Sequence, residues 1–576
     1  MKQEPVNPKN FESRVQDLIY NVDEGIGSLL AKAGIYLFAV IALMSVYWIS
    51  QFWGLKDADA MDQAQIARNL MEGEGFTTKV IRPATTWHFE QHGVDPRTIM
   101  LQQPDIIHPP VYPWLLAQAF RLVGGSFDPG QKVRAYPPEQ RAIVPLGNLF
   151  TILTGILIYL IARRFFEPRI ALLGASVFFL TDRVWATSIS GTSLPLATLL
   201  ATLAVYLALI LAERLVEEEP LTRWILPLVF TAIACALAFL TRYAAGWILV
   251  VIVVAISFMA PRRGWQAALM LIALTALFVS PWIIRNIQVV GMPFGMTTHL
   301  IHNQPSDILA RSYEQALKPK PNADALQIKW KANAGKFYET ALPAAGTGIM
   351  AALFVATFFF RFTRENVHIL RFGLLAGIIG LFLSACFFGE SSMQTMAIFW
   401  PLMILYGLSF FFILLDRLQI IIPIVRGAVI AALVFVNSVP LILTLMPPRT
   451  GVPYPPYYPS YIALVTNMMQ EDELVGTDMP WATAWYGDCS SLFIPYTLEE
   501  FYQINDIQKR VSGLYFTTLT RDLPYVSGIV TGPYRSWYPI FREMIPLDFP
   551  LTEAFFISGR DQLFLTDRAR WPQQQR

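Results

Sequence analysis

Long charge-free apolar runs constrain this chain more than any other feature. A bilayer core of about 30 Å requires roughly 20 apolar residues per helix, and eleven segments approach or reach that length. Hydrophobic residues make up 54% of the chain and charged residues 15%, whereas soluble domains carry about 25% charge. We therefore predict a polytopic α-helical membrane protein. The predicted spans are 34–55, 142–162, 170–190, 194–212, 224–241, 243–260, 264–284, 340–360, 372–389, 391–415 and 427–448.

Basic residues indicate how this bundle is oriented. With the N-terminus inside, alternating spans place the pairs Arg163–Arg164 and Arg262–Arg263 on the inner side. Short outer turns carry few basic residues, with Arg183 and Arg242 as exceptions. The positive-inside rule favours this orientation. We expect residues 1–33 to be cytoplasmic and the first span to be a retained signal anchor. The absence of cysteine pairs favours a bacterial inner membrane, and composition leaves an endomembrane open as the alternative.

The spacing of the spans divides the chain into a bundle over 34–448 and an outer C-terminal segment over 449–576. Within the bundle, the outer loops 56–141 and 285–339 exceed the length usual for plain connections, and the first contains helix-like stretches at 60–72 and 109–123. A Pro/Tyr-rich linker at 447–459 precedes the C-terminal segment, for which we predict a small α/β domain. Its helix-like stretches are 461–470 and 497–504, and its strand-like runs are 511–516, 554–558 and 562–566.

Charge and cysteine content exclude several classes of protein. A net charge of +2 excludes a strongly basic nucleic-acid binder. Three cysteines exclude a disulfide scaffold and a Cys-rich metal centre. No cluster of His, Cys and carboxylate side chains has metal-ligand spacing. The sequence therefore implies no cofactor, and only a weak divalent-metal site stays open.

Three carboxylates follow the first span in the segment KDADAMDQAQIARNLMEGEGF, residues 56–76. Asp57, Asp59 and Asp62 lie where the chain leaves the bilayer and a helix begins. One interpretation is structural, because Asp59 could cap that helix. The other is chemical, because a carboxylate at the membrane face can accept a proton from an acceptor hydroxyl beside a lipid-borne donor.

Several motifs resemble the GT-C superfamily of membrane glycosyltransferases, in particular its protein O-mannosyltransferase and aminoarabinose-transferase branch. The resemblance begins with the acidic segment and its Ala-Arg-Asn-Leu helix ending in Gly-x-Gly-Phe. Further elements follow in the expected order between residues 34 and 415. They are HPPVYPWLLA (108–117), AFLTRYAAG (238–246), SPWIIRNIQVVGMPFG (280–295) and the region 389–405.

The resemblance implies an inverting transferase that takes a monosaccharide from a polyprenyl-phosphate carrier at the outer face of the membrane. Asp59 matches the catalytic base, with Asp57 as its competitor and Asp62 as possible support. His108, Arg242 and Arg285 match basic positions that bind the donor phosphate. Arg82 is a further basic candidate. The acceptor would be a hydroxyl or amine of a protein, glycolipid or polysaccharide.

Some features depart from the family pattern or leave alternatives open. The region before Pro401 reads GESSMQTMAIFWP and lacks the Arg-Tyr pair of many relatives. Asp182 lies within a predicted span, where an ionisable residue indicates function or a polar contact in the bundle. A non-catalytic GT-C-like scaffold within a membrane assembly is the main alternative, and a secondary transporter is a weaker one because no internal repeat is evident.

Overall fold

The structure is a computed structural model that describes residues 26–124, 127, 136–301, 323–341, 348–362, 364–447, 459–521, 529–532, 534–542, 544–557 and 562–571. The chain divides after Phe52 into two units. The first contributes helix α2 (Ile26–Gln51), whose segment Leu30–Gln51 is long and apolar enough to cross a membrane. Most of the segment 1–33, which we expect to be cytoplasmic, and most of the linker 447–459 lie outside the described residues.

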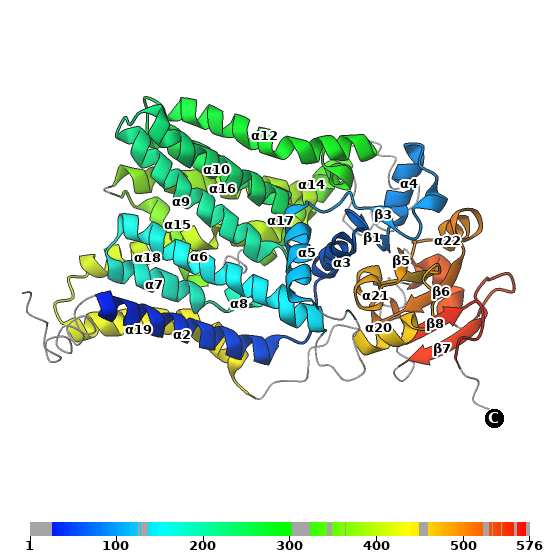
Figure 1. The fold of residues 1–576 in the computed structure, drawn as a ribbon. Coiled ribbons are helices and arrows are strands. Elements are labelled where there is room, and N and C mark those ends of the chain that lie inside the picture. The colour runs from blue at the N-terminus through cyan, green and yellow to red at the C-terminus, as the bar shows by residue number, and fades with distance from the viewer. Residues whose placement is uncertain are drawn as a thin grey trace, which may run out of the picture. The chain divides into compact units, whose positions relative to one another are not determined.

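The second unit, which starts at Trp53, contains the helical bundle. Its long apolar helices are α6 (Val144–Phe165), α9 (Leu194–Val216), α10 (Leu221–Thr241), α12 (Gly264–Val290), α16 (Glu365–Phe388), α18 (Trp400–Arg417) and α19 (Pro423–Leu445). Shorter helices are α7 (Pro168–Phe179), α8 (Asp182–Ser188), α11 (Trp247–Met259) and α15 (Gly348–Ala356). Helices α9 and α10 run side by side in Figure 1. Helix α11 packs against α16.

The helical architecture predicted from the apolar runs is confirmed, but the count of eleven spans is not. Across the described ranges of both units, eight helices are long and apolar enough to cross a membrane. The count is nine if α7 and α8, which meet at a 61° bend, form one span. The remaining expected spans, 243–260 and 340–360, are represented by the shorter helices Tyr243–Met259 and Gly348–Phe359. The first begins with a tight 3-10 turn (η3, Tyr243–Gly246), which shortens α11.

Sequence explains where several of these helices begin, end and pack. Proline in the first turn starts α7, α9 and α19, a position where its missing N–H costs nothing. Gly291 ends α12 at φ 71°, which glycine adopts without strain. On α16, a Cβ at Gly380 would lie 2.1 Å from the Trp247 ring, so the absent side chain lets α11 approach closely.

A six-stranded sheet lies beyond the bundle, and the small C-terminal sheet region predicted from the sequence is present. The strand order is β2 (Val80–Ile81), β5 (Ser490–Phe493), β4 (Leu474–Thr477), β6 (Val511–Phe516), β8 (Gln562–Thr566) and β7 (Glu553–Ile557). Strands β2, β5, β4 and β6 run parallel to one another. Strand β8 pairs antiparallel with β6 on one side and with β7 on the other. Helices α20 (Pro459–Thr466), α21 (Pro480–Gly487) and α22 (Leu498–Gln503) accompany the strands.

The first outer loop contributes directly to this sheet. Strand β2 comes from that loop, and Ile81 and Met100 join Leu514 and Trp537 in the core beneath the strands. The same loop also contains a pair of short antiparallel strands, β1 (Thr77–Thr78) and β3 (Gln103–Pro104). The loop helices are α3 (Ala58–Glu72), α4 (Pro83–Gln91) and α5 (Val111–Val123), and α3 packs on α5 and α21. The loop and the C-terminal segment therefore fold together rather than as separate pieces.

Candidate active site

The start of helix α3 positions the acidic segment. Asp57 is the N-cap residue, and its carboxylate accepts a hydrogen bond from the backbone N–H of Asp59 at 2.9 Å. The expectation that Asp59 provides the cap is therefore wrong. Spacing alone allowed either residue, whereas only Asp57 has the extended backbone (φ −91°, ψ 129°) that an N-cap requires. With its neighbour occupied in the cap, the Asp59 side chain is available to the site.

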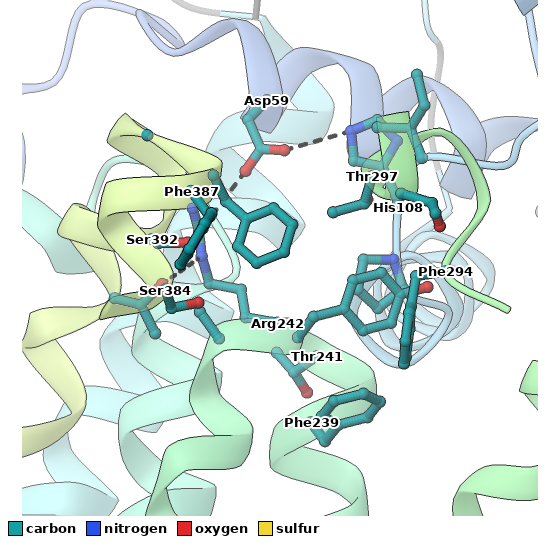
Figure 2. Close-up of a pocket in the computed structure, with 18 of the residues that line it drawn as sticks. Asp59, His108, Phe239, Thr241, Arg242, Phe294, Thr297, Ser384, Phe387 and Ser392 are labelled. Atoms are coloured by element: carbon teal, nitrogen blue, oxygen red, sulfur yellow. Dashed lines mark hydrogen bonds and ion pairs between the residues drawn. The ribbon is translucent and has the colours of Figure 1, made fainter. Parts of the chain in front are cut away.

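Two cationic side chains from distant segments converge on Asp59. Arg242 Nη1 lies 3.4 Å from Asp59 Oδ2, and His108 Nε2 lies 3.3 Å from Asp59 Oδ1. Figure 2 shows the carboxylate between these two groups. The Asp59 side chain keeps 33% of its surface exposed, so the ion pairs leave one side of the carboxylate open.

Burial and charge act in opposite directions on the acids here. Burial opposes ionisation of Asp59, but the hydrogen bond from His108 and the charge of Arg242 outweigh it, so the pKa of Asp59 is lowered. Burial and the adjacent charge of Asp59 instead raise the pKa of Asp57. Asp59 is therefore the more readily ionised of the two carboxyl groups.

Arg242 is held in place by hydroxyl groups from two other helical segments. It follows α10 and is buried. Its Nε donates to Thr395 Oγ1 at 3.2 Å, and Nη1 donates to Ser193 Oγ at 3.3 Å. Thr395 begins the short helix η7 (Thr395–Phe399), in the region that lacks the family's Arg-Tyr pair. In this chain that region supplies a hydroxyl that orients Arg242.

His108 is oriented by Asp105 from the same loop. Asp105 Oδ1 lies 3.2 Å from His108 Nδ1, while Asp105 Oδ2 accepts backbone N–H groups from Ile107 and His108. Burial lowers the pKa of His108, but the charges of Asp105 and Asp62 outweigh it, so the net pKa lies well above its usual range. Burial raises the pKa of Asp105, and the charge of His108 reverses the shift, so its pKa is lowered.

Asp62 and Arg82 form a buried ion pair behind this array. Asp62 also accepts a hydrogen bond from Thr78 Oγ1 at 3.2 Å, and its Oδ2 lies 3.7 Å from His108 Nε2. Both residues thus lie next to the site, but neither lines its cavity. They are placed to support His108 rather than to contact a ligand.

A cavity of about 490 Å³ opens in front of Asp59, within the size range of small-molecule sites. One part of its wall is polar, with Asp59, Gln63, His108 and Arg242. Another part is aromatic, and Figure 2 shows Phe239, Phe294 and Phe387 around the opening. The cavity therefore combines a charged end with an apolar wall.

The structure does not bring Arg285 or Asp182 to this cavity. Arg285 Nη1 donates to the backbone oxygen of Asp105 at 2.8 Å, and its guanidinium lies 4.8 Å from the centre of the Trp282 ring. It supports the loop that carries His108. Asp182 lies in the first turn of α8, where the helix dipole favours an acidic group.

Further residues of the site were not singled out from the sequence. Helix α14 (Ala323–Ala341) lies in the second outer loop. It brings Lys329, Asn333 and Lys336 to the cavity wall. The segment is rich in lysine in the sequence. The spacing of four residues from Lys329 to Asn333 and of three from Asn333 to Lys336 places these side chains on one face of a helix. No motif or spacing in the sequence identifies Ser193 or Thr395 as residues of the site.

No group of three or more His, Cys, Asp or Glu side chains suited to a metal ion occurs in the described part of the chain. We therefore assign no residue to a metal. The polar groups of the site are instead arranged as one carboxylate between two cations, an arrangement that can hold a negatively charged ligand and accept a proton.

Comparison with known proteins identifies the class of fold. No protein-family model and no curated protein matches the sequence. Solved structures, by contrast, match over most of the chain, and they are membrane glycosyltransferases of the GT-C superfamily. This chain has the GT-C fold.

The matching structures include proteins from Cupriavidus metallidurans and Archaeoglobus fulgidus. ArnT from Cupriavidus metallidurans in the apo state is 13% identical with a TM-score of 0.55, covering 94% of this chain and all of that one (100%). The same protein bound to undecaprenyl phosphate is 12% identical, with a TM-score of 0.54 and coverage of 93% and 98%. The archaeal oligosaccharyltransferase AglB from Archaeoglobus fulgidus, in complex with an inhibitory peptide and a dolichol-phosphate, is 11% identical, with a TM-score of 0.53 and coverage of 93% and 74%.

Proposed function

We propose that this protein is a membrane glycosyltransferase that transfers a monosaccharide from a polyprenyl-phosphate carrier to an acceptor hydroxyl or amine. The observation that carries this proposal is the position of Asp59. Its carboxylate lies between Arg242 and His108 on the wall of a cavity that also has an aromatic side. A proton acceptor and a phosphate-binding cation are thus within reach of one ligand.

In the proposed reaction, Asp59 is the general base. The acceptor oxygen or nitrogen attacks the anomeric carbon, the bond from that carbon to the phosphate oxygen breaks, and the electron pair leaves with polyprenyl phosphate. The acceptor proton passes to Asp59. This one-step displacement inverts the anomeric centre. Because the pKa of Asp59 is lowered by its cationic neighbours, the carboxylate is ionised before the reaction begins.

Arg242 has two roles in this scheme. In the empty site it faces the Asp59 carboxylate at 3.4 Å. As negative charge develops on the departing phosphate, the guanidinium stabilises it. Once Arg242 is shared with the phosphate, Asp59 loses part of the stabilisation of its charged form, and its proton affinity rises. Departure of the carrier and acceptance of the proton therefore assist each other.

The apolar wall suits a lipid carrier. Phe239, Phe294 and Phe387 line the cavity near the ends of α10, η4 (Gly295–Ile301) and α16. The structural neighbours include one protein bound to undecaprenyl phosphate and another in complex with a dolichol-phosphate. Together with the positive-inside pattern, these features support a site on the outer face of a bacterial inner membrane, with an extracytoplasmic C-terminal domain. The acceptor would belong to a protein, glycolipid or polysaccharide.

A transfer assay with purified full-length protein tests this function. We expect radiolabelled sugar to pass from a polyprenyl-phosphate sugar to membrane extract, and Asp59→Asn to reduce the rate by about 10²–10⁴-fold. Asp472→Asn, at an exposed site in the C-terminal domain, is the matched control. If the wild type consumes none of a panel of donors but copurifies with stable partners, the proposal fails and the GT-C-like scaffold becomes the better interpretation.

A further inference from the structure

The wall of the cavity carries more positive than negative charge. Among the described residues that line it, Asp59 is the one carboxylate, whereas His108, Arg242, Lys329 and Lys336 are basic. Asp59 lies against the first two of these cations. The two lysines belong to α14 and add further positive charge to the cavity wall. The excess of basic over acidic groups on this wall favours a ligand that carries negative charge.

Helix α14 is fixed on the bundle by the same face that carries the lysines. Asn333 Nδ2 donates to the backbone oxygen of Cys386 at 2.9 Å. The Phe337 and Phe382 rings meet edge to face with centroids 5.1 Å apart. Because Lys329 and Lys336 are four residues before and three residues after Asn333, they share its helix face. The contacts of Asn333 and Phe337 thus direct both lysines to the cavity.

The surroundings of Lys329 favour an anionic ligand. Its side chain is 7% exposed, although lysine is seldom buried. Burial lowers the pKa of its ammonium group, because the charged form loses hydration. A phosphate in the cavity would favour the charged form of Lys329 through charge-assisted hydrogen bonds.

We infer that Lys329 and Lys336 bind the phosphate group of the lipid carrier, so that the second outer loop supplies part of the active site. This inference rests on the proposed function. In the donor the phosphate is a diester with one negative charge, whereas the released polyprenyl phosphate approaches two. The lysines therefore bind the leaving group more tightly than the donor, and this difference lowers the barrier to transfer.

Binding of farnesyl phosphate to the full-length protein in detergent tests the inference by calorimetry, without depending on turnover. The variants are Lys329→Gln, Lys336→Gln and the double variant. Lys331→Gln is the matched control, because Lys331 is exposed on the same helix and does not line the cavity. We expect about tenfold weaker binding for each single lysine variant and a larger loss for the double variant. Lys331→Gln should bind within twofold of the wild type, and Lys329→Arg should recover most of the affinity.

Two further probes, inorganic phosphate and farnesol, distinguish the sources of the ligand chemistry. Farnesyl phosphate binding more tightly than either supports a lipid phosphate as the ligand. Equal binding of inorganic phosphate would overturn the assignment to a lipid carrier. Wild-type affinity in a folded double variant would overturn the role of the lysines while leaving the transferase proposal standing. A wild type that neither binds farnesyl phosphate nor transfers sugar would overturn both.

Discussion

Asp105 Oδ1 lies 3.2 Å from His108 Nδ1, and the opposite ring nitrogen, Nε2, faces Asp59 Oδ1 at 3.3 Å. The imidazole thus bridges a buried carboxylate and the carboxylate that we propose as the base. With Nδ1–H donated to Asp105, Nε2 can donate to Asp59 only when the ring is protonated. The charge state of His108 therefore controls the orientation of Asp59.

We expect Asp105→Asn to move the alkaline limb of the pH profile for kcat/KM to lower pH. The pKa of His108 is raised well above its usual range by the charges of Asp105 and Asp62, so the ring keeps its proton to higher pH than a free imidazole does. The substitution removes one negative charge but keeps an oxygen for the backbone N–H groups. Loss of an adjacent negative charge lowers the pKa of a basic group, because the cationic form loses stabilisation. The charged groups around His108 are Asp59, Asp62, Asp105, Arg82 and Arg242.

Transfer rates measured between pH 6 and 10 check this prediction. Asp95→Asn is a suitable control, because Asp95 is exposed in the same outer loop. An unchanged alkaline limb in folded Asp105→Asn protein would contradict the proposed control of Asp59 by His108.

Substitutions at Asp57 separate its capping role from the chemistry at Asp59. Asp57→Ala removes the hydrogen bond to the Asp59 N–H and should destabilise the protein by about 1 kcal/mol. Asp57→Ser restores a capping oxygen without a carboxylate, so we expect it to retain both stability and transfer. Thermal melting in detergent and the transfer assay measure the two effects. Complete loss of transfer in a stable Asp57→Ser variant would assign the base to Asp57 instead.

Elements with a strong local pattern could be predicted from the sequence. The strand-like runs 511–516 and 562–566 coincide with β6 and β8, and the helix expected over 109–123 forms as α5. Strand β2 could not be predicted, because it has two residues and exists through pairing with β5, about 410 positions away. Nothing in the local composition of Val80–Ile81 indicates that partner.

The candidate site likewise contains residues that sequence motifs identify and residues whose role depends on contacts between distant segments. Motif resemblance selected Asp59, His108 and Arg242, and the structure places these three side chains together. It also selected Arg285, which instead contacts the loop of His108 because its guanidinium stacks on Trp282 of the same helix. The contribution of Thr395 depends on how η7 packs against the turn after α10, which spacing along the chain does not reveal.

Arg242→Lys should reduce transfer although it conserves the charge. The guanidinium donates through Nε to Thr395 and through Nη1 to Ser193 while it faces Asp59. A single ammonium group cannot reproduce this planar set of donors. We expect kcat to fall by about 10–100-fold. Arg183→Lys, at an exposed position of α8 outside the cavity, is the matched control and should stay within a few-fold of the wild type. Equal losses in both variants would indicate that Arg242 acts only through general folding.

Asp488→Asn should lower stability by disconnecting α3 from the C-terminal sheet region. Asp488 ends α21 at φ 52° and forms ion pairs with Arg68 at 2.8 Å and Lys79 at 2.7 Å. Asparagine tolerates this left-handed backbone, so the substitution removes the charge without adding strain. Because the Asp488 side chain is 34% exposed, solvent screening limits the expected loss to about 1 kcal/mol.

Asp488→Ala should lose more stability than Asp488→Asn, because alanine adds the cost of a left-handed backbone to the loss of both ion pairs. The measurement is the melting temperature in detergent, with Asp472→Asn as the exposed control. The expected order is wild type, then Asp488→Asn, then Asp488→Ala. A melting temperature for Asp488→Asn equal to that of the wild type would show that packing of α21 on α3, rather than these ion pairs, stabilises the helix that carries Asp59.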